Sequence, residues 1–289
     1  MDYGIRAPSD FNFPAESESI HLVRTATELG INLFDTAPSY NQSEVILGKA
    51  LTNGYSCYVA TKVTLPDADE VSRDVSEFDA VVMNSLQQSL CNLQLNTLDI
   101  VQIHNATTET FAGNIVAQTL GKAKEQGLVR FIGVSVYDES VALAAIESGT
   151  VDVLQIPFSI LDQRPLARVL QIAKKANVGV MGRSVLLKGV LTPKARYLPK
   201  YLSPLFEAAD RIRSALDISW EELPEIAIRY CLGVEGIDTV LLGVRVQSEL
   251  ETALDAVEAG PLPEVEMAFL QDLKLDDEKL LHPGYWGIP

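Results

Sequence analysis

The sequence predicts an α/β fold, a (β/α)8 TIM barrel that residues 1–289 form as a single domain. Short β-branched runs alternate with longer amphipathic stretches along the whole chain, and no linker interrupts them. These runs are too apolar to have one solvent-exposed face. Such uniformly apolar runs are typical of parallel strands that are covered on both sides. A doubly wound sheet is the alternative, but no strand is followed by Gly-x-Gly-x-x-Gly and no P-loop motif occurs.

Seven runs are predicted as strands, one fewer than a closed barrel needs. The first strand is expected to be missing or truncated at the N-terminus, ahead of Met1–Ile5, because the first visible run already follows a helix. The predicted strands are residues 31–35, 57–63, 98–104, 129–135, 151–157, 178–184 and 239–244. The predicted helices are residues 19–29, 78–93, 115–125, 140–147, 166–176 and 221–232.

Charge and composition exclude several classes of protein. Lys and Arg number 23 against 39 Asp and Glu, and a net charge of −16 repels nucleic acids and anionic membranes. No apolar run approaches the roughly 18 residues of a membrane span, and the first residues resemble no signal peptide. We therefore expect a cytoplasmic protein. The three cysteines are far apart, so no metal site is predicted.

Polar and titratable side chains end the otherwise apolar strands. The active sites of barrels form at these C-terminal strand ends, and buried polar groups are costly unless they are paired. The sequence therefore predicts one shared site. The strand-end residues are Asp35, Lys62, His104, Ser135, Gln155, Arg183 and Ser184.

The first three of these residues, with Tyr40, suit proton delivery to a carbonyl group. Lys62 and Asp35 each need the other as a counter-charge when they are buried. A lysine ammonium beside the phenol of Tyr40 favours the phenolate and lowers the tyrosine pKa below about 10. A neutral His104 imidazole could then orient a carbonyl oxygen toward Tyr40 while hydride arrives from elsewhere.

Six stretches of the chain carry these residues and their neighbours: Gly30–Ala37 with Tyr40, Ser43–Leu51, Ala60–Lys62, Leu98–His104, Gly133–Ser135 and Gly179–Leu186. They resemble motifs of the aldo-keto reductase superfamily, and the likeness covers about residues 2–257. Residues 133–137, 161–164 and 183–189 look most like a bacterial, sugar-oxidoreductase-like subgroup. The resemblance implies a (β/α)8 barrel that reduces aldehydes and ketones with NADPH and lacks the dinucleotide glycine fingerprint.

Individual roles follow from this resemblance. Tyr40 would be the proton donor, Lys62 and Asp35 would lower its pKa, and His104 would orient the substrate. In the family, the matching positions bind the nicotinamide carboxamide, the nicotinamide ring, the pyrophosphate and the adenosine 2′-phosphate. The implied cofactor-binding residues are Ser135, Gln155, Arg183, Ser184, Gly243 and Arg245.

Three departures from the family pattern bear on the cofactor. The usual serine–asparagine pair is Ser135-Val136, and the usual acidic–asparagine pair is Thr252-Ala253. Glu249 stands where the family has glutamine or arginine, and its carboxylate would repel a 2′-phosphate, leaving Arg245 as the counter-charge. NADP(H) is the implied cofactor, and NAD(H) or no cofactor are the alternatives.

Three functions follow from these observations. The leading prediction is NADPH-dependent reduction of an aldehyde or ketone, a small-molecule substrate. The second is a redox-neutral dehydratase or isomerase that uses the same acid/base residues, favoured by the altered cofactor positions Val136, Glu249 and Ala253. The third is a non-catalytic binding barrel, against which the complete set of four catalytic residues argues.

Overall fold

The computed structural model describes residues 4–8, 14–51, 56–65, 75–112 and 116–288, and the chain divides into two compact units. Unit 1 comprises residues 1–13, 156–171 and 180–289, and unit 2 comprises residues 14–155 and 172–179. The single barrel domain over residues 1–289 stays a prediction.

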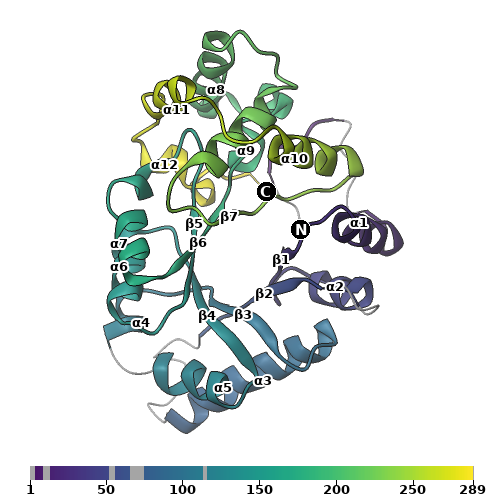
Figure 1. Ribbon diagram of the computed structural model, residues 1–289, viewed down its shortest axis with the longest axis vertical. Helices are drawn as coiled ribbons and strands as arrows, with labels where there is room; N and C mark the ends of the chain where they lie inside the picture. Colours follow the sequence, from purple (N-terminus) through teal and green to yellow (C-terminus); the bar gives the residue numbers. More distant parts are fainter. Residues whose placement is uncertain (1–3, 9–13, 52–55, 66–74, 113–115, 289) are drawn as a thin grey trace. The chain divides into compact units, whose positions relative to one another are not determined.

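Unit 2 holds a parallel sheet whose strands follow one another in chain order (Figure 1). Lys62 of β2 is the register partner of Gln102 of β3, and Ser135 of β4 is the partner of Gln155 of β5. The strands are β1 (Leu33–Asp35), β2 (Tyr58–Val63), β3 (Leu98–Ile103), β4 (Val129–Ser135) and β5 (Val153–Pro157), of which residues 153–155 belong to this unit.

Helices cover this sheet, and Figure 1 shows α1, α2 and α3 beside β1 to β3. Helix α2 approaches α3 closely at Gly48, where a Cβ atom would lie 2.4 Å from the carbonyl oxygen of Asn92. The helices are α1 (Glu16–Glu28), α2 (Ser43–Leu51), α3 (Val75–Leu93), α4 (Thr108–Ala112), a π-helical turn (Ala117–Gly121) with α5 (Lys122–Glu125), α6 (Glu139–Glu147) and α7 (Val169–Ala176), of which residues 172–176 belong here.

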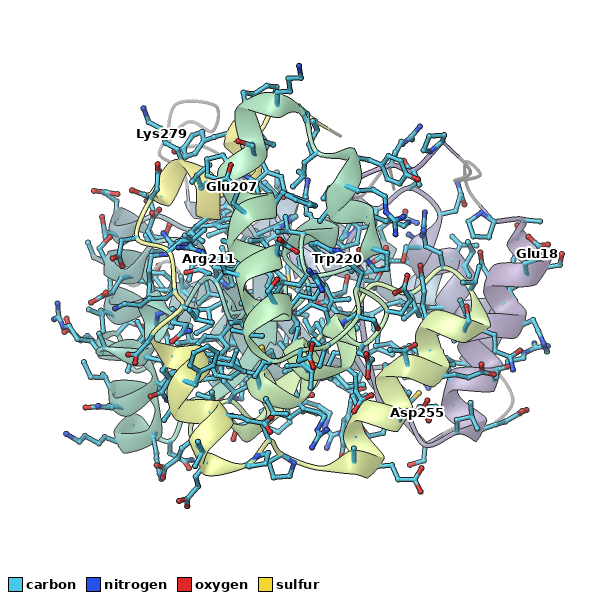
Figure 2. The ribbon with its side chains drawn as sticks, turned by 90° about the horizontal axis from the view of Figure 1, so that it is seen from above. Glu18, Glu207, Arg211, Trp220, Asp255 and Lys279 are labelled. Atoms are coloured by element: carbon cyan, nitrogen blue, oxygen red, sulfur yellow. The ribbon has the colours of Figure 1, made fainter. Side chains whose placement is uncertain are left out.

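Unit 1 contains a short parallel strand pair and several helices. Trp220, labelled in Figure 2, stacks on Phe206 of α8 with ring centroids 5.3 Å apart and fixes the segment after that helix. The elements are β6 (Gly179–Arg183, from residue 180), β7 (Thr239–Val240), α8 (Ser203–Ala215), α9 (Leu223–Gly233), α10 (Gln247–Ala259), α11 (Glu264–Gln271) and α12 (Glu278–Leu281).

The described residues contain all seven predicted strands, mostly with shorter ends. The last strand is much shorter than the predicted 239–244: only Thr239 and Val240 pair with β6, and Leu241 adds one hydrogen bond to Gly182 before the chain leaves the sheet. Part of the predicted 115–125 helix is a π-helical turn. Helices α2, α4, α8, α10, α11 and α12 have no counterpart among the predicted helices.

The predicted gap at the first strand falls on a segment that the structure describes only in part. Residues 4–8 and 14–15 contain no strand, and residues 1–3 and 9–13 lie outside the described residues. Ile5 instead donates its backbone N–H to the carbonyl of Lys188, both in unit 1. Within the described ranges, no helix is long and apolar enough to cross a membrane.

Candidate active site

A buried ion pair lies at the ends of β1 and β2 in unit 2. The Nζ atom of Lys62 donates to Oδ2 of Asp35 at 2.6 Å and to the carbonyl oxygen of Thr36 at 2.9 Å. The Lys62 side chain is 1% exposed and that of Asp35 is 16% exposed. At this depth the lysine needs its counter-charge and hydrogen bonds to remain an ammonium ion.

Two aromatic residues complete this cluster. Tyr40 lies in the turn between β1 and α2, where its backbone N–H donates to Ala37 and its carbonyl accepts from Ser43. The Lys62 Nζ atom lies 4.8 Å from the centroid of the Tyr40 ring. The rings of Tyr40 and His104 meet edge to face, with centroids 6.2 Å apart and planes at 83°. A cation, a phenol and an imidazole therefore share one small volume.

The other oxygen of Asp35 receives two amide donors. The Nε2 atoms of Gln102 and Gln155 donate to Asp35 Oδ1 at 2.9 and 2.8 Å. Gln155 in turn accepts from the Ser135 hydroxyl at 3.1 Å. Gln102 is not among the residues predicted for the site, although it lies two positions before His104 in an apolar strand and hence on the same face.

A second buried carboxylate, which the sequence analysis also missed, ties the elements around the site together. Glu44 of α2 is 2% exposed and accepts from the Thr61 hydroxyl at 2.7 Å and from the Asn92 amide at 3.0 Å. Thr61 directly precedes Lys62, and α2 begins three residues after Tyr40. This network therefore fixes the helix that follows Tyr40 against the strand that carries Lys62.

The remaining predicted residues lie in unit 1. Arg183 ends β6, and its guanidinium lies 3.4 Å from the hydroxyl of Ser184, whose φ of 61° is in the left-handed region. Gly243 is exposed in the segment between β7 and α10. Arg245 lies close to Glu249 in the first turn of α10, with the guanidinium 3.3 Å from one carboxylate oxygen and the backbone N–H donating to the other at 2.7 Å.

The Arg245–Glu249 pair joins two residues to which the sequence analysis gave opposite roles. The predicted counter-charge for a 2′-phosphate is itself paired with the carboxylate predicted to repel that phosphate.

Lys188, in the segment after β6, is half-buried, and this burial lowers its pKa below the ordinary value of 10.5.

The model of the Aldo/keto reductase family matches residues 3–274 of this chain. The chain belongs to the aldo/keto reductase family. The predicted family is therefore confirmed, together with its fold class, a (β/α)8 barrel of which the described residues contain seven strands, and with its enzyme class, oxidoreductase.

Three relatives illustrate how far this aldo/keto reductase resembles known members. L-galactose dehydrogenase of Arabidopsis thaliana is 31% identical over 266 residues, covering 86% of this chain and 81% of the relative. The oxidoreductase YqkF of Bacillus subtilis is 26% identical over 274 residues, with coverages of 89% and 87%. The structure of aldo-keto reductase AKR11C1 from Bacillus halodurans, holo form, matches with a TM-score of 0.76 at 26% identity, covering 97% and 100%.

Members of this family use nicotinamide cofactors, and the donor set in unit 2 fits one part of such a cofactor. A carboxamide presents one acceptor and two donors. The Ser135 hydroxyl and the Gln155 amide, 3.1 Å apart, offer the complementary groups.

The structure brings six of the ten predicted site residues together in unit 2 and places the other four in unit 1. The six are Asp35, Tyr40, Lys62, His104, Ser135 and Gln155.

Proposed function

We propose that this aldo/keto reductase reduces an aldehyde or ketone to the alcohol with NADPH, and that Tyr40 donates the proton. The observation that carries the proposal is the cluster of Asp35, Lys62, Tyr40 and His104 in unit 2, in which the buried ammonium lies 2.6 Å from a carboxylate oxygen and 4.8 Å from a phenol ring. An isolated structural tyrosine or histidine does not require such a cation, so the whole cluster favours catalysis.

The four residues divide the work as follows. His104, edge to face with Tyr40, would hold the substrate oxygen near the phenol. As the carbonyl carbon gains hydride and its π bond breaks, the oxygen takes the Tyr40 proton and the alcohol forms. The Lys62 ammonium stabilises the phenolate that remains, and Asp35 keeps Lys62 charged. Bulk solvent returns the proton to Tyr40 after the alcohol leaves.

Ser135, Gln155, Arg183, Ser184, Gly243 and Arg245 are proposed to hold the cofactor. When bound, the dinucleotide supplies the hydride at the nicotinamide ring. Ser135 and Gln155 would bind the carboxamide, and the flat guanidinium of Arg183 would stack on the ring. Ser184 would meet the pyrophosphate, and Gly243 and Arg245 would lie at the adenosine end.

NADH is the second candidate for the reductant, and the Arg245–Glu249 pair favours it. Arg245 is the proposed charge for a 2′-phosphate, but Glu249 lies 3.3 Å from its guanidinium and its own charge opposes an added phosphate. An NADH ribose carries no phosphate at this position, so the pair would not weaken its binding.

Fluorescence titration of the purified protein with NADPH, and separately with NADH, tests the proposal first. We expect saturable binding of NADPH with a Kd in the micromolar range. Tighter binding of NADH would identify the second candidate. A folded protein that binds neither nucleotide would overturn the reductase proposal and favour redox-neutral acid/base chemistry by the same residues.

Turnover gives the second test. Because one relative is an L-galactose dehydrogenase, aldoses and simple aldehydes are the first substrates to assay. We expect oxidation of the reduced nucleotide in proportion to the alcohol formed. Conversion of substrate that continues after exhaustive removal of nucleotide would contradict the proposal.

A further inference from the structure

We propose that Gln102 is a positioning residue of this site: its amide holds the carboxylate of Asp35, and through it the Lys62 ammonium, in the arrangement that lowers the cost of ionising Tyr40. The inference rests on the proposed function, because it assigns Tyr40 the role of proton donor. Its basis is the hydrogen bond of 2.9 Å from Gln102 Nε2 to Asp35 Oδ1.

The position of Gln102 in the sheet makes this contact a property of the fold. Gln102 is fully buried in β3 and is the register partner of Lys62 on β2, so the two side chains emerge side by side from parallel strands. Each of them reaches a different oxygen of Asp35 on β1. The carboxylate is therefore held from both sides by residues of one sheet layer.

The second polar atom of Gln102 shows that the amide is not there for packing. Its Oε1 atom is buried and has no hydrogen-bond partner among the described residues. An unsatisfied buried acceptor costs free energy, and an apolar side chain of the same size would avoid that cost. A charge-assisted bond to a carboxylate is among the stronger hydrogen bonds, which explains why an amide occupies this place.

Gln155 is the other amide donor to Asp35, and it has a second proposed partner. The Gln155 amide also donates to Asp35 Oδ1, but the same side chain is proposed to bind the cofactor carboxamide together with Ser135. The Gln155 Nε2 group carries two N–H bonds, so it can donate to a carboxamide and to Asp35 at once, but its orientation then depends on both partners. Gln102 is not among the proposed cofactor ligands, so its hydrogen bond would remain and keep the carboxylate charge partly compensated.

The direction of the effect follows from electrostatics. Amide donors on Oδ1 spread the negative charge of Asp35 and restrain the carboxylate against Lys62. Without the Gln102 amide, a more concentrated negative charge faces both Lys62 and the forming phenolate of Tyr40. Ionisation of Tyr40 then requires a higher pH, and we expect kcat to fall roughly tenfold to hundredfold, with little change in KM.

The test substitutes Gln102→Met, which keeps the volume and removes the donor, and Gln102→Asn, which withdraws the amide by one methylene. The matched control is Gln163→Met, because Gln163 is another buried glutamine, whose amide donates to the carbonyls of Ile160 and Leu270.

NMR of protein labelled with ¹³C at the tyrosine ζ-carbon follows the ionisation of Tyr40. The Tyr40 signal is assigned as the one that is missing in Tyr40→Phe. This readout needs neither cofactor nor substrate.

We expect both Gln102 variants to ionise Tyr40 at higher pH than the wild type, while Gln163→Met leaves the midpoint unchanged. An unchanged Tyr40 midpoint in the folded Gln102 variants would overturn the inference, even in an active reductase. A shifted midpoint in a protein that binds neither nucleotide would support the positioning role and reject the proposed function, so the two failures are distinguishable.

Discussion

The Nζ atom of Lys62 lies 2.6 Å from Asp35 Oδ2 and 4.8 Å from the centroid of the Tyr40 ring, so one buried cation serves a carboxylate and a phenol at once. Stability and proposed catalysis therefore depend on the same three side chains.

Lys62→Met should abolish most carbonyl reduction and also destabilise unit 2. The substitution leaves Asp35 without its cation, and removing one partner of a buried ion pair costs about 3 to 5 kcal/mol. The double variant Asp35→Asn with Lys62→Met should recover much of this loss, because it leaves no uncompensated charge. Urea unfolding measures the free energy of unfolding of the single and the double variant. A double variant less stable than Lys62→Met would contradict the account.

Tyr40→Phe should reduce kcat by about 10² to 10⁴ and leave the fold intact, since it removes only the proton donor. The ring contacts with Lys62 and His104 do not need the hydroxyl. Tyr58→Phe is the matched control, because Tyr58 is half-exposed at the start of β2. Steady-state rates decide: equal rates for Tyr40→Phe and Tyr58→Phe would refute the proton-donor role.

Glu249→Gln should shift the cofactor preference toward NADPH by about tenfold relative to NADH, because it removes the negative charge beside Arg245. Glu251→Gln is the control: Glu251 lies on the same helix but contacts Gln247. The ratio of the two dissociation constants, measured by fluorescence, should change only in the first variant, and less at high salt. An unchanged ratio of the two dissociation constants would show that Arg245 does not bind the 2′-phosphate.

Gly48→Ala should destabilise the protein by about 1 to 3 kcal/mol, since the new Cβ would lie 2.4 Å from the Asn92 carbonyl oxygen and would force α2 and α3 apart. Gly121→Ala is the contrasting variant, because this glycine is helical and has no heavy atom within 4 Å of the new Cβ. It should be neutral or stabilising by about 0.5 to 1 kcal/mol. Urea unfolding of both variants checks the contrast, which equal stabilities would contradict.

The burial of Lys188 predicts a pH-dependent stability. Because burial lowers its pKa in the folded state, folding is penalised while the lysine is protonated in both states, and the penalty disappears as pH rises through the folded pKa toward the ordinary 10.5. The free energy of unfolding of Lys188→Met should therefore exceed that of the wild type most at neutral pH, and the difference should shrink toward pH 10.5. A difference that is constant with pH would rule out this effect.

The sequence alone predicted the α/β alternation and six of the polar residues that meet in unit 2. Both signals are local: β-branched runs mark strands, and a polar residue such as Lys62 or His104 at the end of an apolar run needs a partner. Local patterns were weaker where an element depends on packing. Helix α2 went unpredicted because it is fixed largely by Gly48 against α3 and by the buried Glu44.

The tertiary structure decided how the side chains are paired. Gln102 and Gln155 are 67 and 120 residues from Asp35 in sequence, yet both donate to its Oδ1 atom. The hydrophobic periodicity of the sequence does not predict such contacts, because strand register and side-chain direction exist only once the sheet has formed. The pairing of Arg245 with Glu249 is different: the spacing of four residues was visible, but the charges have opposite roles toward a phosphate, and only the geometry brought them together.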